Sequence, residues 1–434
     1  MSGYFIRIAL LSTLLGCAGF SSAPISPRED ALIVRGLLKE EATRYREAQK
    51  IFLELYRLTA KPEYLYQAAR EGMMPGGDPE KVLPLLRRLV ETKRIKGDRL
   101  PARLLVALYA RKGALREAEA VVKRWLATSD DPRDLKLAAT VEADLGHYEE
   151  AVALLQKAYL KSRDEKLLLD EVILLQKKLH DPDRAIRLLE THLRLYPEAS
   201  VAVYFKLIEL YARRNDLAKV QELYKKLYEN DPQDYLLKKI IKLSLYRRDF
   251  EGLARFLEKH SDGNEELLYT LYKELDRFDK AIALAHRRYK QTGKPKWLAE
   301  EAILTYEKAR KAKRITPDLL RRFQRLFDQA LKEGVDESLY LNYYGYTLID
   351  HDLDVQRGMA LVRQALKQQP DNPFYLDSLA WGLYKEGRCA EAQKVMQKVI
   401  AAGGLKEPEI RMHAESIRRC VERHKTTPAD RAAE

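Results

Sequence analysis

Residues that could do chemistry are few in this chain of 434 residues, and none stands in a familiar catalytic pattern. The sequence has no glycine-rich phosphate loop, no dinucleotide-binding glycine motif, no G-x-S-x-G serine motif and no H-E-x-x-H zinc motif. The eight histidines are scattered, and the absence of a C-x-x-C pair excludes a zinc ribbon or a thioredoxin-type site. We therefore expect a non-catalytic protein that uses no cofactor and no small-molecule substrate.

One short segment gathers several possible metal ligands. Asp350, His351, Asp352 and Asp354 lie within five residues, and their oxygens and imidazole suit a divalent cation. The same residues also suit a polar turn between two helices, where aspartate is a common cap. Residues 180–183 have a similar composition. We favour the turn in both places and predict no metal site.

The composition indicates long helices with charged outer faces. Glycine and proline total 20 and 17, which is too few for collagen, for low-complexity sequence or for a turn-dense β sandwich. Charged residues make up 33% of the chain, and 46% is hydrophobic, so a folded core is expected. The 78 Lys and Arg against 65 Asp and Glu give a net charge of +13.

The amino-terminal residues are typical of an export signal. Arg7 precedes an apolar run of eight residues, Ile8–Leu15, which is too short to span a bilayer but fits a secretory signal peptide. The run ends in Leu14-Leu15-Gly16-Cys17, which resembles the lipobox of bacterial lipoproteins.

The lipobox resemblance implies a cellular address. Residues 1–16 would be the signal peptide, Cys17 would carry the acyl chains, and residues 17–28 would form a tether. Ala18 replaces the Asp that tends to keep such proteins in the inner membrane of enteric bacteria, so we expect the outer membrane, on its periplasmic face. An ordinary signal peptide with an incidental cysteine and an uncleaved anchor are the alternatives.

The body of the chain repeats itself with a period of about 34 residues. An aromatic or leucine residue is followed, three positions later, by a small or aliphatic residue and then by another apolar residue. This small-residue slot is filled by Ala48, Leu83, Ala118, Ala151, Ala185, Val220, Leu253, Ala281, Gly358 and Ala392. The steps are 35, 35, 33, 34, 35, 33, 28, 77 and 34 residues, and the 77-residue step leaves room for two units, one of them divergent.

This period, with these residue types, resembles the tetratricopeptide repeat. The best match is Asn372–Ile400, with Ala380 in its first helix, Gly387 in its turn and Ala392 in its second helix. The resemblance implies an all-α, right-handed superhelical solenoid of antiparallel helix pairs, with about eleven units over residues 29–401. One pair alone cannot bury its apolar face, so neighbouring pairs must stack.

The carboxyl end is predicted to close the solenoid. Residues 402–424 read as a capping helix with a charged outer face, and residues 425–434 as a disordered tail. Cys389 lies 15 residues before Gly404 and Cys420 lies 16 residues after it, so an antiparallel hairpin would bring the two cysteines level. They form either a disulfide, which export would permit, or two separately buried thiols.

The family resemblance also places a groove on the first helices of the pairs. The groove positions hold eight cations in the middle units, against the anions Asp144, Asp170 and Glu209, and nearby aromatic residues include Phe205, Tyr235 and Tyr246. The cations are Arg103, Arg111, Lys136, Lys177, Lys178, Arg213, Lys238 and Lys242. They indicate either a functional basic groove or the general surface of a basic chain.

The last two units place a different set of side chains at the same positions. These are Asn342, Tyr346, Phe374, Trp381 and Tyr384. Two interpretations are open: an aromatic patch that binds a peptide, or packing between helices.

Together these features predict an interaction scaffold for a protein of the cell envelope, in assembly or secretion machinery. The alternative is a binding module for an acidic polysaccharide in exopolysaccharide export. Nucleic acid is not expected as a partner despite the isoelectric point near 9.3, because export would separate the two.

Overall fold

The computed structural model describes residues 26–92, 98–126, 128–260 and 263–425, and these residues form helices joined by short turns. The lipobox with Cys17, most of the predicted tether and residues 426–434 lie outside the described part of the chain. The molecule divides into two units, residues 1–240 and 241–434, and each is described by itself. The boundary falls within α14 (Asp234–Tyr246).

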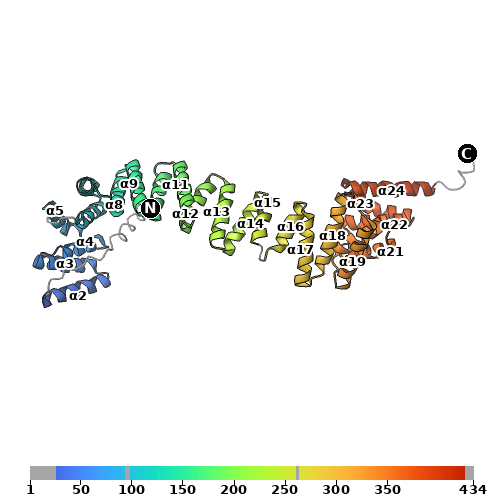
Figure 1. Cartoon of the computed structure of the whole chain (residues 1–434), viewed down its shortest axis with the longest axis horizontal. Helices are drawn as coiled ribbons and strands as arrows, with labels where there is room; N and C mark the ends of the chain where they lie inside the picture. The colour runs from blue at the N-terminus through green and yellow to red at the C-terminus, as the bar shows by residue number, and fades with distance from the viewer. Residues whose placement is uncertain (1–25, 93–97, 127, 261–262, 426–434) are drawn as a thin grey trace, which may run out of the picture. The chain divides into compact units, whose positions relative to one another are not determined.

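Unit 1 is built from consecutive helix pairs (Figure 1). Its helices are α2 (Pro27–Glu41), α3 (Tyr45–Thr59), α4 (Pro62–Met73), α5 (Leu83–Glu91), α6 (Leu100–Lys112), α7 (Leu115–Val121), α8 (Pro132–Leu145), α9 (Tyr148–Ser162), α10 (Glu165–Lys177), α11 (Pro182–Leu195), α12 (Val201–Arg213) and α13 (Leu217–Asn230). A 3₁₀ turn, η1 (Pro79–Lys81), precedes α5, and a π-helical turn, η2 (Val122–Leu126), continues α7.

Unit 2 continues the same alternation. Its helices are α15 (Phe250–Lys259), α16 (Glu265–Glu274), α17 (Phe278–Thr292), α18 (Lys296–Lys311), α19 (Pro317–Lys332), α20 (Ser338–Asp350), α21 (Val355–Gln368), α22 (Pro373–Lys385), α23 (Cys389–Ala401) and α24 (Pro408–Lys425), with a 3₁₀ turn, η3 (Gly404–Lys406), before α24. No strand occurs among the described residues. The expected fold class, an all-α superhelical repeat of antiparallel helix pairs, is confirmed.

The ten residues of the small-residue slot occupy one structural position. Nine of them are the fourth residue of the second helix of a pair, and Leu83 is the first residue of α5, just after η1. All ten are buried, with Ala48, Ala151 and Ala392 fully inaccessible. At Gly358 the slot faces Gly345, Leu348 and Ile349 of the first helix of its own pair, so only a small residue fits there.

The 77-residue step corresponds to two pairs, α18/α19 and α20/α21. In the first of them the fourth residue of the second helix is Leu320, which packs against the core but is only partly buried. Phe323 and Phe327, further along α19, are buried, and the ring of Phe327 stacks on that of Tyr344 of α20 with centroids 4.8 Å apart. A slot position thus exists between Ala281 and Gly358, but its residue is not small.

The helix ends follow ordinary capping chemistry, which moves two predicted boundaries. Helix α2 begins at Pro27, inside the predicted tether, because the Ser26 hydroxyl accepts a hydrogen bond from the Glu29 amide at 3.2 Å and Pro27 suits the first turn. The predicted capping helix begins only at Pro408, after η3. Within the described ranges, no helix has the length and apolar character needed to cross a membrane.

Two glycines bring the backbones of α20 and α21 into close contact in unit 2. A Cβ atom on Gly345 of α20 would lie 2.7 Å from the carbonyl oxygen of Gly358 on α21, and a Cβ atom on Gly358 would lie 2.7 Å from the carbonyl oxygen of Gly345. Backbone atoms cannot move aside as a side chain can, so the pair requires glycine at both positions.

We predict that Gly345→Ala lowers the free energy of unfolding by about 1–3 kcal/mol, because the methyl group forces α20 and α21 apart. The matched control is Gly382→Ala on α22, whose Cβ would meet the side chain of Met359, which can rotate away, so its loss should be smaller. Urea unfolding of the full chain, followed by circular dichroism, measures both. Equal losses would show that the backbone contact is not limiting.

Candidate functional site

The predicted groove cation Arg103 is buried in an ion-pair cluster. Its guanidinium contacts the carboxylate of Asp131 at 2.7 Å and also that of Asp134, and its side chain is 11% exposed. Arg99 joins the same cluster through Asp134, which is fully buried. Hydrogen bonds from Arg133 and the charge of Arg103 hold the pKa of Asp131 well below its usual range. Arg103 thus links α6 to α8 and is not available to a ligand.

Further predicted cations form similar links between first helices of neighbouring pairs. The Nζ of Lys136 on α8 lies 2.9 Å from an oxygen of Asp170 on α10. The guanidinium of Arg111 on α6 donates to the carbonyl of Met74, at the end of α4, at 3.0 Å. On α12, Arg213 pairs with Glu209 at 2.9 Å. Glu209 in turn accepts a hydrogen bond at 3.2 Å from the side-chain amide of Gln176 on α10.

Six of the eight predicted cations are exposed: Arg111 and Arg213, which also make the contacts just described, and four lysines. Lys177 and Lys178 end α10, and Lys238 and Lys242 lie on α14. The Nζ of Lys178 also lies 5.5 Å from the centre of the Tyr148 ring. The predicted aromatic neighbours are exposed as well, with Phe205, Tyr235 and Tyr246 at 38%, 49% and 78%. The basic surface is therefore slightly smaller than the eight residues suggest, because Arg103 and Lys136 are partly buried in ion pairs between helices.

The five residues of the predicted aromatic patch do not form one open surface. Trp381 is 8% exposed and lies between two rings, with Tyr384 at 4.8 Å and His413 at 4.1 Å between centroids. Its indole nitrogen donates to Asp350 at 3.2 Å. The Oδ1 of Asn342 is buried, whereas Phe374 is 55% exposed. In this structure Trp381 is part of the packing between α20, α22 and α24.

A buried histidine fixes the final helix, and the sequence analysis did not single it out. His413 on α24 is inaccessible, and its Nδ1 lies 3.0 Å from an oxygen of Asp377 on α22, which is also buried. Burial raises the pKa of the Asp377 carboxyl, although the hydrogen bond with His413 opposes that rise. The only sign of this pair in the sequence is that residues 377 and 413 are polar although they occupy positions on the buried side of their helices.

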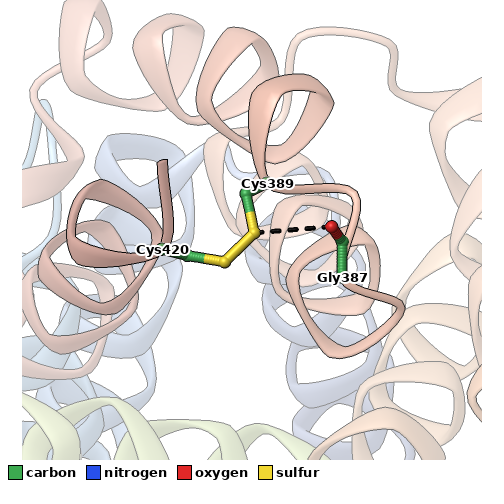
Figure 2. Close-up of a disulfide and its surroundings, with 3 residues drawn as sticks. All are labelled: Gly387, Cys389 and Cys420. Atoms are coloured by element: carbon green, nitrogen blue, oxygen red, sulfur yellow. Dashed lines mark hydrogen bonds between the residues drawn. A yellow bond between two sulfur atoms is a disulfide. The ribbon is translucent and has the colours of Figure 1, made fainter. Parts of the chain in front are cut away.

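The structure joins Cys389, the first residue of α23, to Cys420 on α24 (Figure 2). Their Cα atoms lie 5.8 Å apart, and the Sγ of Cys389 lies 3.5 Å from the carbonyl oxygen of Gly387. Both side chains are buried against Val421 and Tyr384. Together with the contact between His413 and Asp377, this bond would fasten α24 to the last pair at two places.

The possible metal ligands serve other contacts. The Asp350 side chain accepts from Trp381, Asp352 pairs with Lys385 at 2.7 Å, and Asp354 caps α21 by accepting from the Arg357 amide. Glu119, Glu142 and His147 form a group in the described part of the chain whose ligand atoms lie within 4.8 Å of one another. Arg116 and Lys123 already pair with Glu119, and His147 contacts Glu142 at 2.7 Å, so this group is an ion-pair cluster.

Two glutamates are buried and form no ion pair with the residues that the structure describes. Glu171 on α10 is 1% exposed and Glu71 on α4 is 2% exposed, and burial raises the pKa of each to about 7. The Oε2 of Glu171 makes no hydrogen bond within the described residues. A neutral carboxyl group is the form that such surroundings favour.

We predict that Glu171 makes the stability of the protein depend on pH. Its pKa in the folded state lies above its pKa in the unfolded state. Its stabilising contribution to the free energy of unfolding is therefore fully present below about pH 4.5, is lost as the pH rises to about 7, and does not change further above that pH. Glu171→Gln should therefore raise the free energy of unfolding at pH 8 by up to roughly 3 kcal/mol relative to wild type, and by little at pH 4. The control is Glu150→Gln at an exposed position on α9. A pH-independent difference would contradict this interpretation.

We further predict that loss of the Cys389–Cys420 bond lowers the free energy of unfolding by roughly 2–4 kcal/mol, since it closes a loop with a sequence separation of 31. Cys389→Ser, Cys420→Ser and the double variant should lose about the same amount, because each removes one bond. Mass spectrometry after alkylation, with and without reductant, measures the bond itself. Alkylation of both cysteines without reductant would refute it.

Comparison with known proteins supports the repeat type. No protein-family model matches the chain. Over 65 residues it is 34% identical to a TPR repeat-containing protein of Pseudomonas aeruginosa, a match that covers 15% of this chain and 11% of that protein. The chain thus spans about a ninth of the length of this relative.

Solved structures with a partial likeness include the Cut9–Hcn1 hetero-tetramer of the APC/C and the yeast Tom70. The first is 11% identical with a TM-score of 0.36 and covers 93% of this chain and 92% of that one. Tom70 is 15% identical with a TM-score of 0.36 and covers 94% and 99%. We draw no conclusion about function from them. The expected resemblance to the tetratricopeptide repeat is confirmed by the helix pairs, their buried small-residue slot and the match in sequence.

Proposed function

We propose that the protein is a non-catalytic scaffold that binds another protein of the cell envelope, in assembly or secretion machinery. A fold of stacked tetratricopeptide-type pairs is a protein-protein interaction fold, which is the general part of this proposal. The more specific part is the cellular location: a lipid anchor at Cys17 holds the protein in the outer membrane, with the repeats facing the periplasm. The sequence from Arg7 to Ala18 supports the address.

One observation carries the proposal most directly. The first helices of neighbouring pairs in unit 1 use many of their polar side chains on one another, as in the pairs of Arg103 with Asp134 and Lys136 with Asp170. Phe205 on α12 and Tyr235 on α14 nevertheless remain exposed, and Lys177 and Lys178 remain exposed on α10. Exposed aromatic side chains are a type that protein partners contact, and the neighbouring lysines favour a partner surface of negative charge.

We predict that a photo-cross-linking residue at Phe205 or Tyr235 captures the same envelope protein in stoichiometric amount from intact cells. The matched control is the same residue at Leu160, which is 55% exposed on the second helix α9 and should capture much less. Fractionation of the envelope, comparing wild type with Cys17→Ala, tests the address separately. Equal capture at all three positions, or none, would contradict the scaffold, whereas a cytosolic wild-type chain would contradict the anchor.

A second function, binding of an acidic polysaccharide, is favoured by the lysines that stay exposed beside Tyr235. Lys238 lies three residues after Tyr235 on α14, and Lys177 and Lys178 are adjacent on α10. Binding through such residues should weaken steeply between low and physiological salt, and Lys177→Glu with Lys178→Glu should weaken it further. A chain that binds no acidic glycan at low salt would exclude this function.

A further inference from the structure

Helix α2 packs one side against α3, and several apolar side chains on its other side are not covered by the described residues. Leu32 and Gly36 are buried, and a Cβ atom on Gly36 would lie 2.9 Å from the ring of Phe52 on α3. At 100° per residue, Ala31, Val34 and Leu38 lie on the opposite side of the helix, with Leu37 beside them. We call these four residues the outer face of α2.

The outer face is exposed to a degree that a stable helix in water seldom shows. Val34, Leu37 and Leu38 are 56%, 47% and 58% exposed, and Ala31 is exposed too. Single exposed leucines are common, but neighbouring ones on a single helix face mark a contact site.

Charged residues border the outer face along one edge and at both of its ends. Arg28 and Arg35 lie along the edge and are exposed, while Asp30 and Glu41 lie on the outer face itself, one turn before Val34 and one turn after Leu37. Arg28 is within 4.0 Å of Glu54 on α3 but keeps 75% of its side chain exposed. An apolar stripe with arginines along one edge suits a surface that is apolar inside and anionic at its rim.

We propose that the outer face of α2 contacts the phospholipid surface of the membrane that holds the chain. This inference rests on the lipid anchor of the proposed function. Ten residues lead from Cys17 to Pro27, and a tether of that length spans at most about 35 Å. The anchor would therefore keep α2 beside the bilayer at a high local concentration, where a small apolar face is sufficient for contact.

Two other occupants fit the face less well. A second copy of the chain would need an interface of about 20–30 residues a side for a stable dimer, and four side chains on one helix fall far short of that. The apolar run Ile8–Leu15 of the same chain would be removed with the signal peptide. The membrane alone needs no minimum area, because the acyl chains already supply the attachment.

The experiment uses the lipidated full-length product in vesicles of phosphatidylethanolamine and phosphatidylglycerol that carry a nitroxide-labelled lipid. An environment-sensitive fluorophore is attached at Val34→Cys or, as the control, at Leu160→Cys, which has almost the same exposed fraction. The acylated Cys17 and the bonded Cys389 and Cys420 leave the new cysteine as the reactive one. We expect the emission of the fluorophore at residue 34 to shift to the blue. Its quenching by the labelled lipid should be at least about twofold stronger than at residue 160.

A charge placed in the outer face should reverse the effect. Leu38→Asp should abolish the quenching at residue 34 while the protein still floats with the vesicles, and Leu160→Asp should leave it unchanged. Flotation without quenching at residue 34 would overturn the membrane contact and keep the anchor. A chain that fails to float would overturn both. A blue shift without vesicles that grows with protein concentration would assign the face to a second copy instead.

Discussion

The fold depends on how closely the two helices of each pair can approach. At one position in the second helix, the side chain must be small or must be packed with little free volume, and the ten slot residues meet this requirement. Gly345 and Gly358 show the limiting case, in which backbone touches backbone. Once a pair has this spacing, one apolar side is left uncovered, and the next pair covers it. The repeat is therefore a consequence of packing, and its period of about 34 residues is the length of chain that two such helices and their turns require.

A second set of contacts joins the first helices of neighbouring pairs. Some are ion pairs, such as Lys136 with Asp170 in unit 1. Others are hydrogen bonds from tyrosine side chains to carboxylates: in unit 2, Tyr340 donates to Glu300 at 2.9 Å and Tyr343 to Glu307 at 2.5 Å. Burial raises the pKa of both phenols, so they stay neutral donors. These links occupy side chains that a partner could otherwise contact.

The sequence was sufficient to predict the fold class, because the slot residues and their steps record the packing of each pair directly. It was insufficient for the groove, because residue type does not reveal a partner that is distant in the chain. Arg103 occupies a groove position by its register, yet Asp131 and Asp134 on the next first helix enclose it. Trp381 likewise occupies such a position, but His413 covers it from α24. A contact between side chains about 30 residues apart leaves no pattern in the sequence around either residue, whereas a repeated packing position leaves a periodic pattern.

The two terminal helices of the described chain meet the same physical problem in opposite ways. A helix at the end of a stack has no neighbour on one side, so that side must be polar or must find another cover. Helix α24 buries Ile410, His413 and Ile417 and carries arginine and glutamate outside, including the pair of Arg419 with Glu415 at 2.6 Å. Helix α2 instead keeps Val34, Leu37 and Leu38 on its outer face. Polar residues at both ends would serve solubility, and the exposed apolar side chains of α2 are the feature that the proposed membrane contact accounts for.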